Sequence, residues 1–165
     1  MKPDTATKKG LLTGIVMILV SVIIYYTRGN FENRLQYITY TIYVAGIIWA
    51  LLDHSKQPEV KHTFGEYFSQ GFKCFIVVTL LMVIFTAAFL LSQPQLKDEM
   101  AITYKNDLVK TGNYTMPEIE EKIKIARKSF VPALIMGAVF GYLVIGAMVT
   151  VIGSIVFVQR RKMNT

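Results

Sequence analysis

Four long runs without any Asp, Glu, Lys or Arg divide the chain. They cover residues 10–27, 36–52, 74–93 and 129–159, and the polar segments between and around them hold all the charge. A helix needs about 20 apolar residues to cross the hydrocarbon core of a bilayer, with a range of about 17–25. Within lipid every backbone N–H and C=O must be paired inside its own segment, so each run is expected to be an α-helix. The pattern therefore predicts an integral membrane protein.

The runs translate into membrane spans at about residues 10–27, 36–52, 72–92 and 130–158, in one domain over residues 1–165. Buried helices of a soluble protein are the alternative, but such helices are rarely uncharged on every face for this length. A secretory signal peptide is an alternative for the first run, because Lys8 and Lys9 precede it. Its apolar stretch exceeds the usual ~7–15 residues and no small-residue cleavage site follows it, which favours a retained helix.

Residues 93–129 form the largest polar segment, and its sequence predicts two helices. Thr111-Gly112-Asn113 divides the segment. After that break, Thr115 suits an N-cap, Pro117 the first turn, and Glu118 the third helical position. The fold class expected is all-α: an integral membrane four-helix bundle with an extramembrane helical hairpin between the third and fourth spans. The fourth run is too long for one perpendicular crossing, so the helix is expected to tilt, or to bend at Pro132.

An aromatic segment precedes the third span. Thr63 and Glu66 have capping-box spacing, and four aromatic residues then recur at helical spacing: Phe64, Tyr67, Phe68 and Phe72. This pattern predicts an interfacial helix that bends into the third span. Lys73 lies close enough to the start of the span to extend its ammonium group into the headgroups.

Composition and charge agree with a membrane protein. Hydrophobic residues make up 53% of the chain and charged residues 18%, against about 25% charged in soluble domains. The net charge of +7 comes from basic residues that flank the apolar runs, which favours binding to anionic headgroups over nucleic acid. The 18 Lys and Arg residues divide into nine on each side of a four-span topology. The basic residues adjoining the spans, Lys8-Lys9 and Arg160-Arg161-Lys162, favour N- and C-termini in the cytoplasm.

Small residues recur at helix-packing spacing on the first and last spans. Gly10 and Gly14 are four residues apart, as are Gly137 and Gly141, and Gly146 lies on another small-residue stripe. This spacing lets helix backbones approach closely. Oligomerisation through the fourth span is one interpretation, and packing inside a single bundle is the favoured one.

The sequence contains no recognisable catalytic or cofactor site. Asp53, His54 and His62 lack the tight spacing of metal ligands, and the first two are better explained as a polar cap of the second helix. No charge lies in the middle of a span, where it would indicate transport. Deep hydroxyls such as Ser154 are expected to bond their own helix backbone. We find no phosphate-binding loop, nucleophile elbow or zinc-binding helix motif, and therefore expect no enzyme, no metal and no cofactor.

Three motifs, together with the chain length and the four-span layout, resemble a known family. They are Lys9-Gly10-Leu11-Leu12-Thr13-Gly14; the run containing Phe64, Gly65, Phe68, Gly71, Phe72 and Lys73; and a glycine-rich last span that ends in Arg160-Arg161-Lys162. Over essentially the whole chain, this resembles the bacterial domain-of-unknown-function family 4199. The resemblance implies a protein of the inner membrane of Gram-negative bacteria without an assigned activity. It supplies no catalytic or ligand-binding residue.

The favoured function is a non-enzymatic subunit or scaffold that acts through helix packing. Its expected partners are the lipid bilayer and either a second copy or another membrane protein, with no nucleic acid. The alternative is a small transporter or channel, in which several copies line the pore. A polar cavity lined by Tyr40, Tyr43, Thr79 or Ser154 would favour transport, and a dry bundle would exclude a pore within one subunit.

Overall fold

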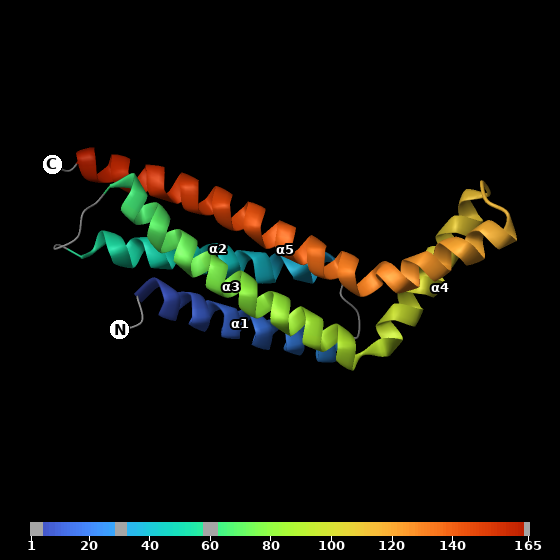
Figure 1. The fold of residues 1–165 in the computed structure, drawn as a ribbon. Helices are drawn as coiled ribbons and strands as arrows, with labels where there is room; N and C mark the ends of the chain where they lie inside the picture. The colour runs from blue at the N-terminus through green and yellow to red at the C-terminus, as the bar shows by residue number, and fades with distance from the viewer. Residues whose placement is uncertain (1–4, 29–32, 58–62, 164–165) are drawn as a thin grey trace. The chain divides into compact units, whose positions relative to one another are not determined.

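The computed structural model describes residues 5–28, 33–57 and 63–163, and within these ranges the chain is all-helical, without strands. Five helices follow one another: α1 (Thr5–Arg28), α2 (Asn33–Ser55), α3 (Phe64–Ser92), α4 (Pro94–Thr111) and α5 (Met116–Met163). Figure 1 shows them in chain order from blue to red. The four apolar runs thus become α1, α2, α3 and α5, and the polar segment becomes α4 with the start of α5.

Three of these helices, α1, α3 and α5, are long and apolar enough to cross a membrane, by length and composition. Between 17% and 28% of the residues in their most apolar windows are buried inside the structure. Large side chains such as Leu19, Ile84 and Phe140 are more than half exposed. In water such a surface would be a strong liability, whereas lipid covers it without cost. The three helices therefore indicate a membrane protein, and α2 does not meet the same criterion within the described residues.

Helix α2 differs from the other apolar helices because hydroxyl groups replace part of its aliphatic surface. Tyr37, Thr39, Tyr40, Thr41 and Tyr43 all lie within its first three turns. Tyr43, Ile47 and Leu51 are fully buried, so one side of α2 packs into the protein. The prediction of four spans is thus supported for three helices, and the fourth depends on how α2 packs.

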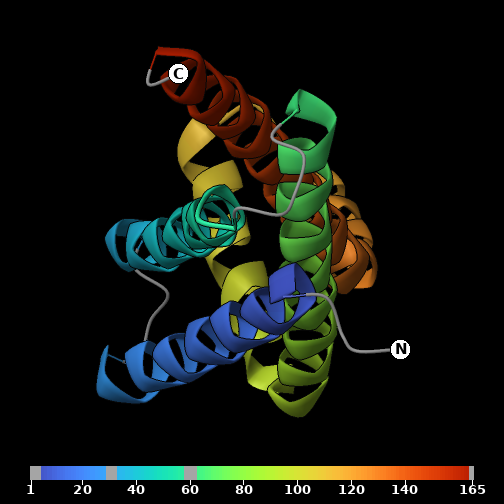
Figure 2. The same ribbon diagram turned by 90° about the vertical axis from the view of Figure 1, so that its left-hand side faces the viewer.

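The chain divides into two compact units, residues 1–82 with 139–165 and residues 83–138. In unit 1, α1, α2, the first part of α3 and the second part of α5 form a bundle, and Figure 2 looks along it from the end where both termini lie. Met17, Ile47, Tyr67 and Val78 are fully buried in its core. Because α3 and α5 each contribute to both units, the assignment of one domain over residues 1–165 stays a prediction.

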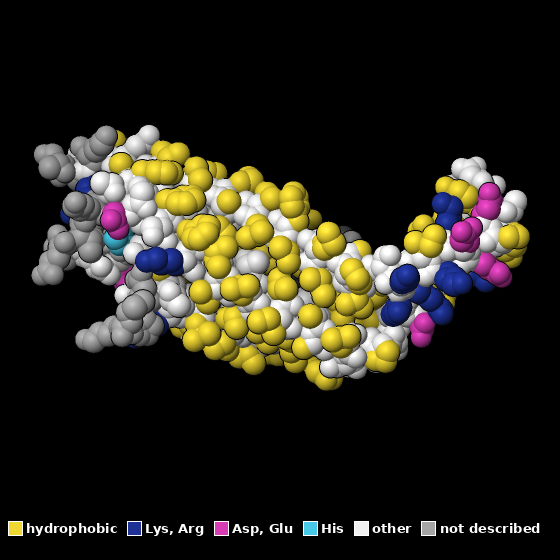
Figure 3. Space-filling view, in the orientation of Figure 1, with side chains coloured by type: hydrophobic (Ala, Val, Ile, Leu, Met, Phe, Trp, Pro, Cys, Tyr) yellow, Lys and Arg dark blue, Asp and Glu magenta, His cyan; other side chains and the backbone are white. Residues whose placement is uncertain are grey.

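Among the side chains of unit 1 that the structure describes, the charged ones gather at the end of the bundle that carries the termini. Figure 3 shows this distribution: hydrophobic side chains cover the visible face of the bundle, and charges lie toward its end. We call this end, with Lys9, Asp53, His54, Tyr67 and Arg161, the polar end. The separation of charge from the apolar surface is that expected of a membrane-embedded bundle.

Helix α3 is one uninterrupted helix from Phe64 to Ser92. The aromatic segment therefore forms its first turns, and the helix is continuous from this segment into the span. The bend expected between them stays a prediction. Glu66 donates its backbone N–H to Thr63 Oγ1 at 3.4 Å, as the capping spacing predicts. Helix α5 likewise continues through Pro132. Its 48 residues exceed the predicted span because the second helix of the hairpin and the span are a single helix.

Unit 2 contains the hairpin predicted from the break at residues 111–113. Gly112 ends α4 in the left-handed conformation with φ 67° and donates its N–H to the carbonyl of Val109, a conformation that glycine adopts without steric cost. Ala101 and Leu108 of α4 and Ile119 of α5 are buried. An exposed ion pair also links the two helices, because Arg127 lies 3.3 Å from Asp98.

Glu118 closes the start of α5 and makes the hairpin turn sensitive to acid. Its carboxylate accepts hydrogen bonds from the N–H and the hydroxyl of Thr115, at 2.7 and 2.8 Å. These bonds, backbone first, hold the pKa of Glu118 below its ordinary value of 4.5, and the Lys122 ammonium adds a smaller effect in the same direction. The group lies outside the predicted span of residues 130–158.

Acid is therefore expected to loosen this turn. Because the pKa is lowered in the folded hairpin, the stabilisation is complete above the unfolded-state pKa and is lost as the pH falls through the folded-state pKa. Amide-exchange protection at Ile119 should decrease below about pH 4.5 relative to the buried Leu108. Glu118→Gln should remove this pH dependence. An equal acid response in the glutamine variant would contradict the assignment.

Candidate functional site

The centre of unit 1 is organised around Tyr43 of α2, which is fully buried. Its hydroxyl donates a hydrogen bond to the backbone carbonyl of Tyr142 on α5 at 2.9 Å and lies 3.5 Å from Thr79 Oγ1 on α3. The ring of Tyr142 packs edge-on against Tyr43 at 5.4 Å and also contacts Tyr40 at 5.7 Å. The hydroxyl thus joins three helices.

Glycines allow the helices to come this close. A Cβ added at Gly10 would lie 2.7 Å from the carbonyl oxygen of Cys74, and one at Gly14 would meet Leu81. At Gly71 a Cβ would lie 2.5 Å from Thr150, and at Gly146 it would collide with the Tyr43 hydroxyl and the Phe75 ring. The first pair packs α1 on α3, and the others pack α5 on α3 and α2.

The remaining predicted packing glycines lie in more open surroundings. A Cβ at Gly141 would meet the Tyr40 hydroxyl at 3.6 Å, which is ordinary contact, and one at Gly137 would meet no described atom within 4 Å. Gly46, which the sequence did not single out, is instead in close contact: a Cβ there would overlap Thr13. The carbonyl of Gly46 also accepts a weak hydrogen bond from the buried thiol of Cys74, with Sγ and O 3.7 Å apart.

The interfacial motif separates into two faces of α3. Phe64, Phe68 and Phe72 stack along the helix with ring centroids 5.9 and 6.0 Å apart. Phe64 and Phe72 are almost half exposed, and Lys73 and Gly65 are also exposed. Gly71 turns the other way, into the contact with Thr150. The motif therefore combines an outward aromatic ladder with one inward packing position.

A buried ion pair marks the polar end. Lys9 Nζ of α1 lies 2.6 Å from the Asp53 carboxylate at the end of α2, with side-chain exposures of 9% and 38%. The same ammonium lies 5.0 Å from the centroid of the Trp49 ring, within the range of a cation–π interaction. The pair joins the first and last turns of antiparallel neighbours, so it fixes how α1 and α2 align.

His54 and Arg161 extend this contact to the other helices. The buried His54 ring packs edge-on against Tyr67 of α3 at 5.0 Å, and Tyr67 stacks on Phe157 of α5 at 5.7 Å. Arg161 donates a hydrogen bond to the carbonyl of Ser55 at 3.3 Å. All four helices of the bundle are thereby joined at this end. His54 lies in the last turn of α2, at the helix end where the sequence placed it, and its side chain is buried there.

A cavity of about 30 Å³ lies beside these groups. It is lined by Thr5, Ala6, Ala50, Asp53, His54, Gln57 and Gln70. Its size suits roughly one water molecule and its lining is polar enough to bind one, but it has no room for an organic substrate. No group of three His, Cys, Asp or Glu side chains arranged for a metal occurs among the described residues, and His62 lies outside them. The polar end is thus chemically suited to holding helices together.

Comparison with known families identifies the family of the chain. The model of a family described as a protein of unknown function (DUF4199) matches residues 8–159. The chain belongs to this family. The resemblance read from the motifs is therefore confirmed. In this DUF4199 chain the matched region includes the Tyr43 centre, the hairpin and all the residues of the polar end except Arg161. No curated protein matches the chain, and no solved structure does.

Sequence reasoning missed the ion pair at the polar end of the DUF4199 chain. Lys9 precedes the first uncharged run directly, and Asp53 follows the second one directly. In two antiparallel adjoining spans these positions fall at the same membrane surface. The opposite charges of Lys9 and Asp53, at ends of spans that lie on the same surface, could therefore have predicted this ion pair.

Removing the Tyr43 hydroxyl tests the centre of the bundle. Tyr43→Phe is expected to lower the free energy of unfolding by about 0.5–1.5 kcal/mol, because the hydrogen bond to Tyr142 is lost. Tyr37→Phe is the matched control, since Tyr37 is 70% exposed, and it should leave stability unchanged. Chemical unfolding in detergent, followed by circular dichroism, measures both. Equal effects of the two changes would show that the hydrogen bond contributes nothing.

Proposed function

We propose that the chain is a four-span protein of the bacterial inner membrane with both termini in the cytoplasm. Three helices are apolar enough to span by themselves, and α2 has its hydroxyls partly satisfied inside the bundle through Tyr43. The tyrosine that would be costly in lipid is thus shielded by α3 and α5. A four-helix bundle with the hairpin of α4 and α5 outside the bilayer follows from this arrangement.

Reporter fusions test the topology. A reporter joined after Thr165 should be active in the cytoplasm, and one inserted at the exposed Gly112–Asn113 turn should be active outside it. If α2 does not span while the N-terminus stays in the cytoplasm, both reporters change sides, because one crossing is lost before α3: the turn reporter becomes active in the cytoplasm and the Thr165 reporter outside it. Activity of the Thr165 fusion only outside the cytoplasm would overturn the proposed topology, and a reporter at the N-terminus would then distinguish an inverted orientation from a non-spanning α2.

We further propose that the protein is not an enzyme and acts by contact, as a subunit or scaffold for another membrane component. The observation that carries this proposal is the closely packed core. Tyr40, Tyr43, Thr79 and Ser154 are the residues that a transport path through one subunit would need, and they line neither the small cavity at the polar end nor a larger one in unit 2. Ser154 instead donates its hydroxyl to the carbonyl of Thr150 at 2.6 Å, as expected for a hydroxyl that serves its own helix.

The hairpin offers the surface through which such contact would occur. Ile102, Val109 and Met116 are 58%, 50% and 63% exposed, although they lie outside the predicted spans. Exposed apolar side chains on an extramembrane element are typical of protein contacts. Contact through this surface would leave the packed core of unit 1 unchanged.

Site-specific photo-crosslinking in native membranes tests the contact function. A photoreactive residue at Ile102 or Val109 should capture one other membrane protein reproducibly, and the same residue at the buried Leu108 should capture none. Recovery of only a second copy of the chain would overturn the subunit proposal. That result would favour the alternative, in which several copies assemble into a transporter or channel.

A further inference from the structure

Unit 2 contains a cavity of about 290 Å³ between α4 and the first half of α5. Most of its wall is apolar, with Met100 and Ala101 from α4 and Phe130, Ala133 and Leu134 from α5. Its volume is at the lower end of the about 300–1,000 Å³ typical of small-molecule sites, which combine apolar walls with a few polar groups. The space suits a slender apolar group rather than a globular polar ligand.

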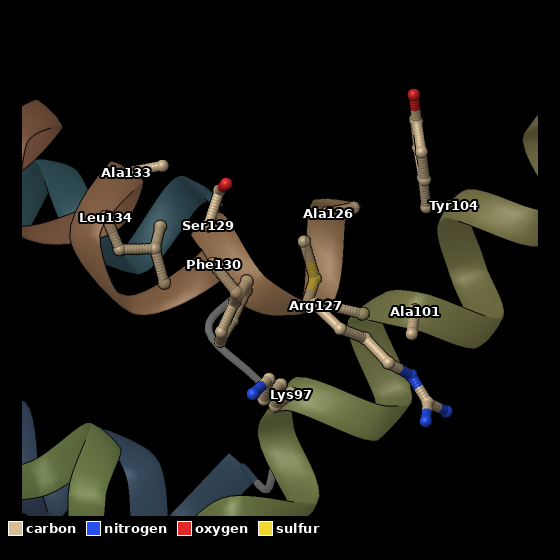
Figure 4. A pocket seen from close by; sticks show the side chains of 10 residues that line it. Lys97, Ala101, Tyr104, Ala126, Arg127, Ser129, Phe130, Ala133 and Leu134 are labelled. Atoms are coloured by element: carbon tan, nitrogen blue, oxygen red, sulfur yellow. The ribbon is translucent and has the colours of Figure 1, made fainter. Parts of the chain in front are cut away.

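Two cations complete the lining, Lys97 from α4 and Arg127 from α5. In Figure 4 the Lys97 side chain lies at the lower edge of the view, below Phe130, whereas the Tyr104 and Ser129 side chains point toward the upper edge. Arg127 forms an ion pair with Asp98, with a nitrogen–oxygen distance of 3.3 Å. No acidic group pairs with Lys97 within the part of the chain that the structure describes. The apolar cavity therefore carries unbalanced positive charge at its edge.

The order of these groups along the chain matches a membrane surface. With the proposed spans at residues 72–92 and 130–158, Phe130, Ala133 and Leu134 belong to the hydrocarbon side. Lys97 and Arg127 belong to the adjoining headgroup region. On the α5 side of the hairpin the charges are also sorted: Lys124, Arg127 and Lys128 lie near the span, and Glu118, Glu120 and Glu121 lie toward the turn. Positive charge next to the bilayer attracts anionic lipid.

We infer that this cavity is a binding site for an anionic phospholipid of the surrounding bilayer. One acyl chain lies along Phe130, Ala133 and Leu134. The anionic headgroup lies between the Lys97 ammonium and the Arg127 guanidinium, whose end groups point in opposite directions in Figure 4. Arg127 can donate two parallel hydrogen bonds to a phosphate, and Lys97 supplies a second charge without losing an existing partner. This inference rests on the proposed membrane boundary, but not on the proposed contact function.

Lipid binding to the full chain in a neutral detergent, read by native mass spectrometry, tests the site. Phosphatidylglycerol with two oleoyl chains should bind more tightly than phosphatidylcholine with the same chains. Lys97→Gln and Arg127→Gln should each weaken binding of phosphatidylglycerol about fivefold, the ratio that corresponds to about 1 kcal/mol per basic residue near an anionic surface. Equal binding of the two lipids to the unaltered chain would overturn the inference.

Matched controls separate the cavity from general surface charge. Lys105→Gln and Lys110→Gln remove cations from the same helix outside the lining, and they should leave binding unchanged. Ala133→Phe fills the apolar part and should weaken binding, whereas Met136→Phe, outside the lining, should not. If the two control lysines matter as much as Lys97, the lipid binds by surface charge alone and the site is wrong.

Two further measurements keep the result interpretable. Every variant should retain its helical circular dichroism and its elution volume, so that lost binding reports the site rather than unfolding. Millimolar inorganic phosphate should fail to displace phosphatidylglycerol, because the acyl chain contributes to binding. Displacement by phosphate would show that the cations hold a soluble anion, and it would overturn the lipid assignment. The proposed topology is tested separately by the reporter fusions, so the two proposals can fail independently.

Discussion

Replacing Gly146 by alanine is expected to destabilise the bundle by about 1–3 kcal/mol, the usual cost of overpacking a well-packed core. The added Cβ would collide with the Tyr43 hydroxyl and lie 2.8 Å from Cγ of Phe75. Neither neighbour has an easy way to move, because Tyr43 is fully buried and Phe75 is 3% exposed. Chemical unfolding of the purified chain in a mild detergent, followed by Trp49 fluorescence, measures the loss.

The same substitution at Gly137 is the matched control. Both glycines lie inside α5, but a Cβ at Gly137 would meet no described atom within 4 Å. Alanine is the better helix former by about 1 kcal/mol, so Gly137→Ala should leave stability unchanged or raise it. Combining Gly146→Ala with Tyr43→Phe should recover part of the loss, since the colliding oxygen is removed. Equal losses at both glycines would contradict the packing described for Gly146.

The second large effect is expected at the polar end, where Asp53→Ala leaves the Lys9 ammonium without its carboxylate. Removing one partner of a buried ion pair costs about 3–5 kcal/mol. Because the Asp53 side chain is 38% exposed, water compensates for part of the loss, and we expect about 2 kcal/mol. Thermal unfolding in detergent, with the helical signal as readout, measures the change.

A double variant distinguishes the charge from the packing. Lys9→Met with Asp53→Leu replaces both charges by apolar groups of similar size, and buried pairs replaced in this way often lose no stability. The double variant is therefore expected to be more stable than Asp53→Ala alone. If it is as unstable as the single variant, the carboxylate does not act through Lys9. Glu118→Ala is a matched control for loss of a carboxylate, since it alters the hairpin turn and should leave unit 1 unaffected.

The elements were largely predictable because their signals are local. The uncharged runs predict the positions of the apolar helices. The hairpin is predicted by the break at residues 111–113 and by the helix-start residues Thr115 and Glu118. The helix ends were less accurate: α1 begins at Thr5, before its uncharged run, and the second helix of the hairpin and the fourth span form one helix, α5. The aromatic segment is likewise continuous with α3, because the alternation of rings and polar groups does not itself mark where a helix ends.

The contacts were less predictable because they depend on neighbours distant in sequence. Gly137, Gly141 and Gly146 look alike as small residues on one helix, but only Gly146 meets a neighbour too closely to accept a Cβ. Gly46 has no second glycine four residues away, and yet it packs on Thr13. These positions differ in the side chain that faces them from a neighbouring helix. The sequence of the glycine's own helix does not specify that side chain.

The buried thiol at the contact of α2 with α3 has a practical consequence for spectroscopy. Cys74 is the chain's one cysteine, and it is fully buried against the carbonyl of Gly46. Water-soluble maleimides react with exposed thiolates, so the native chain should remain unlabelled while folded. Cysteines introduced in pairs on the hairpin, at Ile102 and Ile125 for example, can then carry spin labels or fluorophores without removal of the native residue. Distances between α4 and α5 become measurable in a chain whose interior is unaltered.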